Sequence, residues 1–242
     1  MRNFAALVTF CAALALPSAA QAAGLVVNGD FEAGNGGFDS DYSYVDPLGT
    51  NTTEGQYTVR TNPWPWNGAF FSMGDHTSGS GQMMVINGSP NVGDLVWQSG
   101  SIDIATGTNY FFEAFVANVC CSGGGINPPF LTFSVSLDNG AETALVQLGV
   151  PGDPVGNWIG LSSQFNSGSA TKARLSLFNA NTIREGNDFA IDDINLDTRS
   201  IVVVDGGVPE PATWAMMLMG FGAIGAALRK RKTNAGRRLR VA

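Results

Sequence analysis

Carboxylates are the most numerous side chains in this sequence that could do chemistry, and they set the first limit on its function. Between Ala23 and Asp205 there are nineteen acidic residues and five basic ones, a net charge of 5 − 19 = −14. A body this acidic does not neutralise phosphates, so no nucleic-acid partner is expected. Two carboxylates that face each other across a cleft can hydrolyse a glycosidic bond. Among nineteen acidic residues some pair will always appear to have a suitable spacing, so the presence of carboxylates does not indicate a hydrolase.

Histidine and the common catalytic motifs give no support for an enzyme. The single histidine, His76, lies in the Ser/Gly-rich turn "GDHTSGSG", whereas a nucleophilic triad or a zinc site normally uses further histidine or cysteine side chains. The sequence contains no G-x-S-x-G, no P-loop and no dinucleotide-binding fingerprint. We therefore expect a protein that is not an enzyme.

Aromatic side chains suit a binding function better. The stretch 62–68, "NPWPWNG", places Trp64 and Trp66 in a loop stiffened by proline, where a flat ring can stack on a sugar at low entropic cost. Tyr42 and Tyr57 lie in the same N-terminal third and add rings with a polar tip. The sequence thus predicts a ligand site built from Trp64, Trp66, Tyr42 and Tyr57. The alternative is that the tryptophans close one end of the hydrophobic core.

Two neighbouring cysteines, Cys120 and Cys121, are followed by the flexible stretch "SGGG". Across a trans peptide their Cα atoms would be about 3.8 Å apart, less than the ~4.4–6.8 Å of ordinary disulfides. A vicinal disulfide therefore needs a strained ring, which the following glycines would accommodate. The sequence leaves two alternatives open, a vicinal disulfide and a pair of thiols.

Short apolar runs separated by Gly, Asn, Pro and Asp clusters predict an all-β fold. In the run 130–137, Leu131, Phe133 and Val135 alternate with serine and threonine, as in a strand with one buried face. Half-buried strands of this kind, with no long amphipathic helix, indicate a two-sheet β-sandwich, and their number favours a jelly roll over residues 23–197. The clearest predicted strands are 24–31, 82–86, 94–104, 109–117, 130–137, 142–150, 157–165, 172–180 and 188–196.

The order of these runs resembles the jelly-roll domains of carbohydrate-binding modules and galactose-binding-like proteins. The resemblance rests on "LVVNGDFEAGNGGF", "GDHTSGSGQMMVING" and the closing "DFAIDDINL", and it implies that the domain binds polysaccharide. In such domains the first and last strands lie close together, which would bring Glu32 toward Asp192 and Asp193. Carboxylates that converge without a basic partner repel one another, which raises their pKa values unless a cation lies among them. The resemblance implies a structural Ca²⁺ held by Glu32 and Asp192; the alternative is that these carboxylates are solvated at a strand edge.

Both ends of the chain have the pattern of targeting segments. Residues 1–22 combine a short basic start, an apolar stretch and an Ala-Gln-Ala pattern, which predicts a signal peptide cleaved after Ala22. After a linker at 198–207, the uncharged run 212–228 predicts one transmembrane helix of about 25 Å. A block of basic residues follows, and with the basic tail 233–242 it would hold the C-terminus in the cytoplasm.

The C-terminal segment 208–232 resembles the PEP-CTERM sorting signal. It combines a Pro-Glu-Pro triplet, the apolar run and a basic cluster, and the residues that carry the resemblance are Pro209, Glu210, Pro211, Arg229, Lys230, Arg231 and Lys232. The resemblance implies recognition by an exosortase, a membrane protease of Gram-negative bacteria that make exopolysaccharide. The inner membrane would then hold the protein only transiently, before its delivery to the cell surface or the extracellular matrix.

Together these observations predict an exported, non-enzymatic jelly-roll protein that is sorted by an exosortase and binds polysaccharide. Two other hypotheses stay open: a secreted polysaccharide hydrolase or lyase on the same fold, and a structural matrix protein without a ligand. A hydrolase would lose activity when one carboxylate is changed, whereas a binding module would lose affinity when Trp64 or Trp66 is changed.

Overall fold

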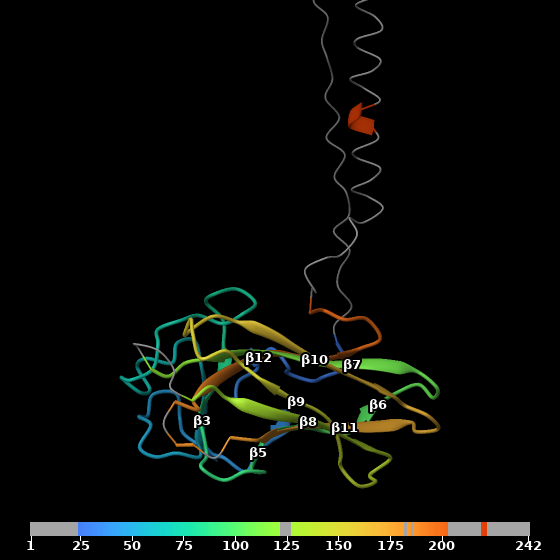
Figure 1. The fold of residues 1–242 in the computed structure, drawn as a ribbon, viewed down its shortest axis with the longest axis horizontal. Coiled ribbons are helices and arrows are strands. Elements are labelled where there is room, and N and C mark those ends of the chain that lie inside the picture. Colours follow the sequence, from blue (N-terminus) through green and yellow to red (C-terminus); the bar gives the residue numbers. More distant parts are fainter. Residues whose placement is uncertain (1–23, 122–126, 182, 185, 203–218, 222–242) are drawn as a thin grey trace, which may run out of the picture. The chain divides into compact units, whose positions relative to one another are not determined.

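The computed structural model describes residues 24–121, 127–181, 183–184, 186–202 and 219–221. The chain divides into two units, Met1–Ser200 and Ile201–Ala242. Twelve strands belong to the described part of the first unit, and they form two layers (Figure 1).

The two layers are six-stranded sheets, here called sheet A and sheet B. Sheet A contains β1 (Phe38–Asp39), β5 (Leu95–Ser99), β6 (Ile102–Asp103), β8 (Phe130–Leu137), β9 (Thr143–Gly149) and β11 (Lys172–Asn179). Sheet B contains β2 (Ser43–Tyr44), β3 (Gln56–Arg60), β4 (Met83–Asn87), β7 (Asn109–Asn118), β10 (Ile159–Asn166) and β12 (Phe189–Asp197). The strand order is β1-β5-β11-β8-β9 in sheet A, where β6 also pairs with β11, and β10-β7-β12-β4-β3-β2 in sheet B. The fold is therefore the two-sheet jelly-roll sandwich that the sequence predicts.

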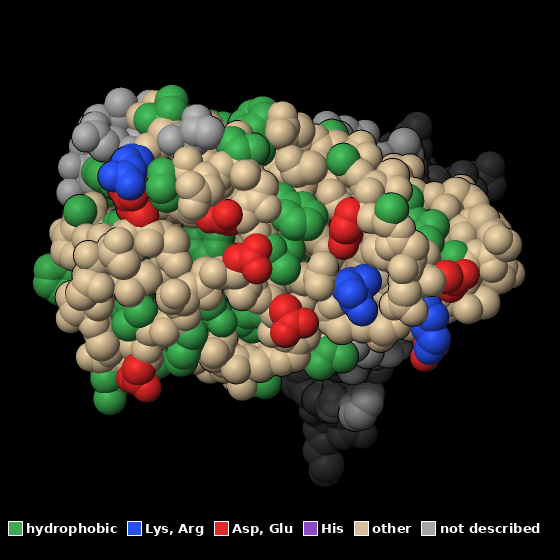
Figure 2. Space-filling view, turned by 90° about the horizontal axis from the view of Figure 1, so that it is seen from below, with side chains coloured by type: hydrophobic (Ala, Val, Ile, Leu, Met, Phe, Trp, Pro, Cys, Tyr) green, Lys and Arg blue, Asp and Glu red, His purple; other side chains and the backbone are tan. Residues whose placement is uncertain are grey.

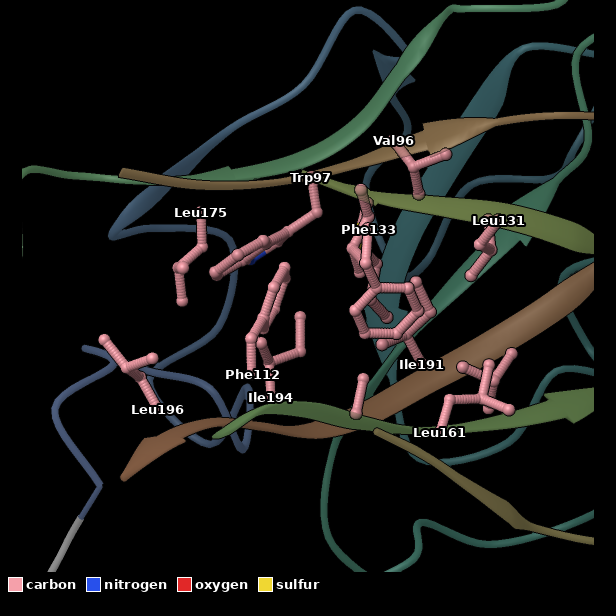
Figure 3. Packing of buried hydrophobic residues seen from close by; sticks show 14 of the residues in the cluster. Val96, Trp97, Phe112, Leu131, Phe133, Leu161, Leu175, Ile191, Ile194 and Leu196 are labelled. Atoms are coloured by element: carbon pink, nitrogen blue, oxygen red, sulfur yellow. The ribbon is translucent and has the colours of Figure 1, made fainter. Parts of the chain in front are cut away.

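The main hydrophobic core lies between the two sheets. Figure 3 shows Trp97 and Leu175 of sheet A facing Phe112 and Ile194 of sheet B. The rings of Phe112 and Phe133 are 4.8 Å apart between centroids, at a tilted angle that aromatic pairs favour. Burial of these apolar side chains on both inner faces is what holds the layers together.

A second, smaller apolar cluster, here called the outer cluster, lies on the opposite face of sheet B. Along β4, Met84 and Ile86 belong to the main core, whereas Met83 and Val85 belong to the outer cluster, as strand alternation requires. The segment 61–82, here called the covering loop, packs onto this face. The covering loop contributes Trp66 and Phe70 to the cluster. The other members come from β4, from β12 and from the residues that follow β7: Met83, Val85, Val119, Cys120 and Ala190.

The outer face of sheet A carries a polar network instead of a second apolar cluster. Ser176 Oγ donates to Glu142 Oε1 at 2.8 Å, and Gln98 Nε2 donates to Ser176 Oγ at 2.9 Å. Figure 2 shows this side of the molecule from below, with separate acidic and basic groups among polar and hydrophobic surface. The two outer faces of the sandwich therefore differ in what covers them.

The predicted first strand, 24–31, is wrong. This segment forms turns, and it is tied to β12 through single hydrogen bonds, from Leu25 N to Leu196 O (3.0 Å) and from Ile194 N to Gly29 O (2.8 Å). Asn28 and Phe31 have φ angles of 53° and 56°, in the left-handed region, which a regular strand does not accommodate.

Several predicted segments fall on residues outside the described part of the chain. They are the signal peptide 1–22 and, in the sorting segment, the Pro-Glu-Pro triplet and the basic cluster 229–232. Residues 219–221 of the predicted span are helical. Among the residues that the structure describes, no helix has the length and apolar character needed to cross a membrane.

Candidate functional site

A polar cleft of about 490 Å³ lies where β3 begins and β4 ends. Gln56 opens β3 opposite Asn87, the last residue of β4, so the strand register fixes one wall of the cleft. The other walls come from the loop before β3, the covering loop and the loop before β12. The lining is made of amides, hydroxyls and one pair of opposite charges: Asn51, Thr52, Thr53, Glu54, Asn67, Asn87 and Arg184.

A hydrogen-bond network holds the amides of this cleft in place. Asn51 Oδ1 accepts from Asn67 Nδ2 at 2.9 Å and from Asn87 Nδ2 at 2.6 Å. Asn51 Nδ2 in turn donates to Gln56 Oε1 at 3.0 Å, and the backbone N–H of Asn51 donates to the carbonyl of Trp66 at 2.9 Å. Three separate chain segments are thereby joined through one side chain. Amides ordered in this way offer donors and acceptors to a ligand without first losing conformational freedom.

Two charged residues line the cleft, and a third is hydrogen-bonded to the residue that follows Asn87. Arg184 Nε lies 3.2 Å from Glu54 Oε2, in a pair that stays accessible to solvent. Asp188 is buried nearby and accepts a hydrogen bond from Gly88 N at 3.0 Å. Burial raises the pKa of Asp188 to about 7; the hydrogen bond from Gly88 opposes this rise, and the negative charge of Glu54 adds to it.

Of the four aromatic residues predicted to bind ligand, only Trp64 offers a ring to solvent. Its side chain is 55% exposed. Trp66 is fully buried in the outer cluster, so the prediction that it stacks on a ligand is corrected; it covers the outer face of sheet B and is not part of the main core. Tyr42 and Tyr57 are corrected in the same way. Both rings lie in the main core, where only their hydroxyl groups find polar partners.

The covering loop meets the two predicted calcium ligands at its far end. Gln82 N donates to Glu32 Oε1 at 2.7 Å, and His76 N donates to Asp192 Oδ2 at 2.8 Å. Burial raises the pKa of Asp192 to about 8, and the negative charge of Asp193 adds to the rise. Among the described residues, no group of three or more His, Cys, Asp or Glu side chains is arranged to hold a metal ion.

The sequence predicts that His76 is an ordinary loop residue, but its side chain makes specific contacts in the structure. Its ring stacks on Phe115 with centroids 3.6 Å apart, and its Nδ1 lies 2.6 Å from Asp193 Oδ2. Asp193 has a φ of 47°, at an irregular point in the pairing of β12 with β7. The two neighbouring aspartates therefore serve different partners, since Asp192 is buried beneath the loop and Asp193 binds the histidine.

Cys120 and Cys121 are joined by a disulfide in the structure. Cys120 is buried in the outer cluster, and Cys121 packs against it from the surface. Cys120 also forms an isolated β-bridge with Phe70, so the disulfide lies where the covering loop meets the end of β7.

The predicted ligand site and the cleft share the stretch 62–68, but the residues that line the cleft were not predicted. Asn67 belongs to the same "NPWPWNG" stretch as the two tryptophans. Asn51, Asn87 and Arg184 come from segments far apart in the sequence, and no spacing rule joins them. The available signal was the unusual number of asparagines at strand ends, which by itself is typical of turns.

Comparison with known proteins identifies one segment of the chain. Residues 207–232 match the PEP-CTERM protein-sorting motif, which confirms the interpretation of the segment 208–232. No curated protein matches this chain in sequence.

Several solved structures are similar to this chain at low sequence identity. The Stig cyclase Fisc from Fischerella sp. TAU is 13% identical over 72% of this chain and 96% of its own, with a TM-score of 0.49. TmCBM61, solved with β-1,4-galactotriose, is 12% identical over 72% of this chain and 97% of its own, with a TM-score of 0.44. The N-terminal CBM22-1–CBM22-2 tandem domain from Paenibacillus barcinonensis Xyn10C is 15% identical over 74% of this chain and 47% of its own, with a TM-score of 0.44.

Proposed function

We propose that this chain is an exported, non-enzymatic protein that an exosortase sorts to the cell surface or matrix, where the polar cleft binds polysaccharide. The observation that carries the binding function is the ordered set of amides beside an arginine–glutamate pair. Sugar hydroxyls both donate and accept hydrogen bonds, so they match a lining of amides and hydroxyls. Hydrogen bonds to the charged groups of Arg184 and Glu54 are stronger than those between neutral groups. Trp64, on the same loop as Asn67, supplies an exposed ring for stacking.

Replacing Arg184 with Ala should weaken polysaccharide binding about 10- to 100-fold, because a hydrogen bond to a charged group contributes roughly 1.5–3 kcal/mol. The measurement is calorimetric titration with the polysaccharides that a glycan array selects. Arg199→Ala is the matched control, since Arg199 is also exposed but lies outside the cleft lining. Equal affinity of the two variants would show that the cleft is not the binding site.

A hydrolase is the second candidate, and one observation favours it. Burial raises the pKa of Asp188 to about 7, and glycosidic cleavage needs one carboxyl group that keeps its proton near neutral pH. We expect no release of reducing ends from the bound polysaccharide. Release that Asp188→Asn abolishes, with binding retained, would establish the enzyme instead.

The sorting function makes a separate prediction on the C-terminal segment. Mature protein from a host with an exosortase should lack the residues beyond the Pro-Glu-Pro triplet and leave the inner membrane, whereas Glu210→Ala should keep the full tail in that membrane. Intact mass and cell fractionation measure both outcomes. Asp205→Ala, just before the matched motif, removes the same charge and should be processed normally. A wild-type protein that keeps its tail would contradict the proposal.

We also propose that Glu32 and Asp192 hold a structural Ca²⁺ together with carbonyl oxygens of the covering loop. Both carboxylates accept hydrogen bonds from this loop, and Asp192 is buried. A Cβ placed on Gly81 would lie 2.0 Å from Glu32 Oε1 and 3.1 Å from Asp75 Oδ2, so carboxylate oxygens of two segments crowd against a residue that has no side chain. Hard oxygen ligands of this kind suit Ca²⁺, which would supply the positive charge that these carboxylates need.

A further inference from the structure

The asparagines that line the cleft differ in how much of their hydrogen-bonding capacity the protein itself uses. A side-chain amide has two N–H donors and two acceptor lone pairs. Asn51 uses all of them. Its Nδ2 donates to the carbonyl of Thr53 and to Gln56 Oε1, each at 3.0 Å, and its Oδ1 accepts from Asn67 and from Asn87. The amide of Asn51 therefore has no donor or acceptor left for a ligand.

Asn67 and Asn87 keep part of their capacity. Asn67 Nδ2 donates once, to Asn51, and its Oδ1 accepts once, from Ala69 N at 3.0 Å. Asn87 Nδ2 also donates once, and its Oδ1 accepts no hydrogen bond from the described residues. That oxygen is not one of the buried, unpartnered atoms of the described chain, so solvent reaches it. Each of the two amides thus retains at least one donor and one acceptor.

The two amides are also neighbours on the cleft wall. Their nitrogens donate to the same oxygen, Asn51 Oδ1, and both residues line the cleft. Neighbouring hydroxyl groups of a sugar ring match an amide of this kind, because one hydroxyl can accept from its N–H while the other donates to its oxygen. Since Asn51 already fixes both amides, these bonds form with little further loss of side-chain entropy.

The charges of the cleft favour a ligand without carboxylate or sulfate groups. Arg184 is the only basic residue among the described residues that line it, and its Nε lies 3.2 Å from Glu54 Oε2. An anionic sugar would have to compete with Glu54 for this guanidinium. The surrounding body, with a net charge of −14, adds a general repulsion of polyanions. Specificity of this kind comes from what the site repels as well as from what it binds.

We propose that Asn67 and Asn87 bind neighbouring hydroxyl groups of an uncharged polysaccharide, while Asn51 positions both amides without touching the ligand. This rests on the binding function proposed above for the same cleft, and it adds the class of the ligand and the residues that select it. A chain whose hydroxyls are methylated cannot donate to the amide oxygens and binds weakly. A chain that carries carboxylates or sulfates meets Glu54 and binds weakly as well.

The ligand class is tested on an array of matched polysaccharides, in which each uncharged polymer has an anionic counterpart. The pairs are dextran and dextran sulfate, fully methyl-esterified pectin and polygalacturonate, hydroxyethylcellulose and carboxymethylcellulose, and agarose and carrageenan. We expect binding to uncharged members only. Stronger binding to an anionic member would overturn the ligand class while leaving polysaccharide binding intact. Binding to no member would contradict the binding function itself.

The residues are tested with the uncharged polysaccharide that the array selects. Asn87→Ala should weaken its binding about 5- to 30-fold, through loss of the hydrogen bonds to the hydroxyls. Asn109→Ala is the matched control and should bind like the wild-type protein. The side chain of Asn109 also shares one hydrogen bond with another asparagine, Asn166, at 2.7 Å, but it lies outside the cleft lining. Equal affinity of the two variants would remove Asn87 from the site.

A methylated form of the same polysaccharide separates contact from positioning. The wild-type protein should bind it about tenfold more weakly than the unmodified chain. Asn87→Ala should reduce this ratio, whereas Asn51→Ala should weaken both chains and keep the ratio. A ratio unchanged in Asn87→Ala would show that its amide does not bind hydroxyls, and a ratio lost in Asn51→Ala would assign the contact to Asn51; either result overturns the proposal. Should Asn87→Ala fail to fold, Asn67→Ser decides the question by the same comparison.

Discussion

Replacing Trp66 with Ala is expected to lower the free energy of unfolding by about 3–5 kcal/mol, whereas Trp64→Ala should change it by less than about 0.5 kcal/mol. Trp66 is fully buried, and its ring packs against Phe70 with centroids 6.0 Å apart. Its backbone carbonyl also anchors Asn51 at the cleft. Trp64 is largely exposed, so its removal leaves no cavity. Urea unfolding of the two variants measures the difference.

This pair of variants also decides how binding data on the loop should be interpreted. Affinity lost in Trp66→Ala would follow from displacement of the covering loop, so it would not indicate that the ring stacks on a sugar. Affinity lost in Trp64→Ala, at unchanged stability, would indicate stacking. If the two variants unfold at the same urea concentration, the outer cluster does not support the fold as described here.

Stability should fall as the pH rises from about 5 to 8. The pKa values of Asp188 and Asp192 are about 7 and about 8 in the folded protein, mainly because of burial, against an ordinary value of 3.8. At pH values between the ordinary pKa and the pKa in the folded protein, the folded state keeps protons that the unfolded state has lost. The free energy of unfolding therefore decreases as the pH rises. The slope reaches about 1.4 kcal/mol per pH unit for each group that titrates. Urea unfolding across this range, in a calcium-free buffer, measures the slope.

Variants at the two aspartates separate their contributions. Asp188→Asn and Asp192→Asn should each flatten the slope, because each removes one titrating group. The slope is the informative quantity for Asp192, whose two oxygens accept hydrogen bonds from His76 N and Asp193 N. An asparagine retains one acceptor there and so costs stability at every pH. A slope unchanged in both variants would mean that other groups dominate the pH dependence.

The same unfolding experiment can be repeated with added calcium. Added Ca²⁺ should restore stability at pH 8 in the wild-type protein and in Asp188→Asn, because the cation favours the ionised carboxylate of Asp192. It should have little effect in Asp192→Asn. Equal stabilisation of Asp192→Asn would place the ion elsewhere in the protein.

The strands of the sandwich were predictable where alternation was regular. The run 130–137 coincides with β8, because Leu131, Phe133 and Val135 all enter the main core. The run 24–31 also carries several apolar side chains but forms turns. Its backbone is set by Asn28, whose side chain bonds to Ala33 N and to the carbonyls of Gly34 and Gly36. Local side chain–backbone bonds of this kind compete with strand pairing and leave no mark in a hydrophobic pattern.

The site was less predictable than the fold, for a physical reason. Proline and tryptophan in the stretch 62–68 indicate a stiff loop, but they do not say whether that loop stands free or lies on a sheet. Here it lies on sheet B, so Trp66 contributes to stability and Asn67 reaches the cleft. The amide network depends on how the fold brings Asn51 and Asn87 together. A single sequence does not show that these two residues are close in space.

The covering loop contributes residues to more than one of the proposed sites. It supplies Asn67 to the cleft, Trp66 to the outer cluster and the backbone N–H of His76 to the hydrogen bond with Asp192. A ligand that orders the covering loop at one site reduces the conformational entropy that the loop must still lose when a second ligand binds at another site. Polysaccharide and calcium should therefore raise each other's affinity, and by thermodynamic reciprocity each must do so by the same factor.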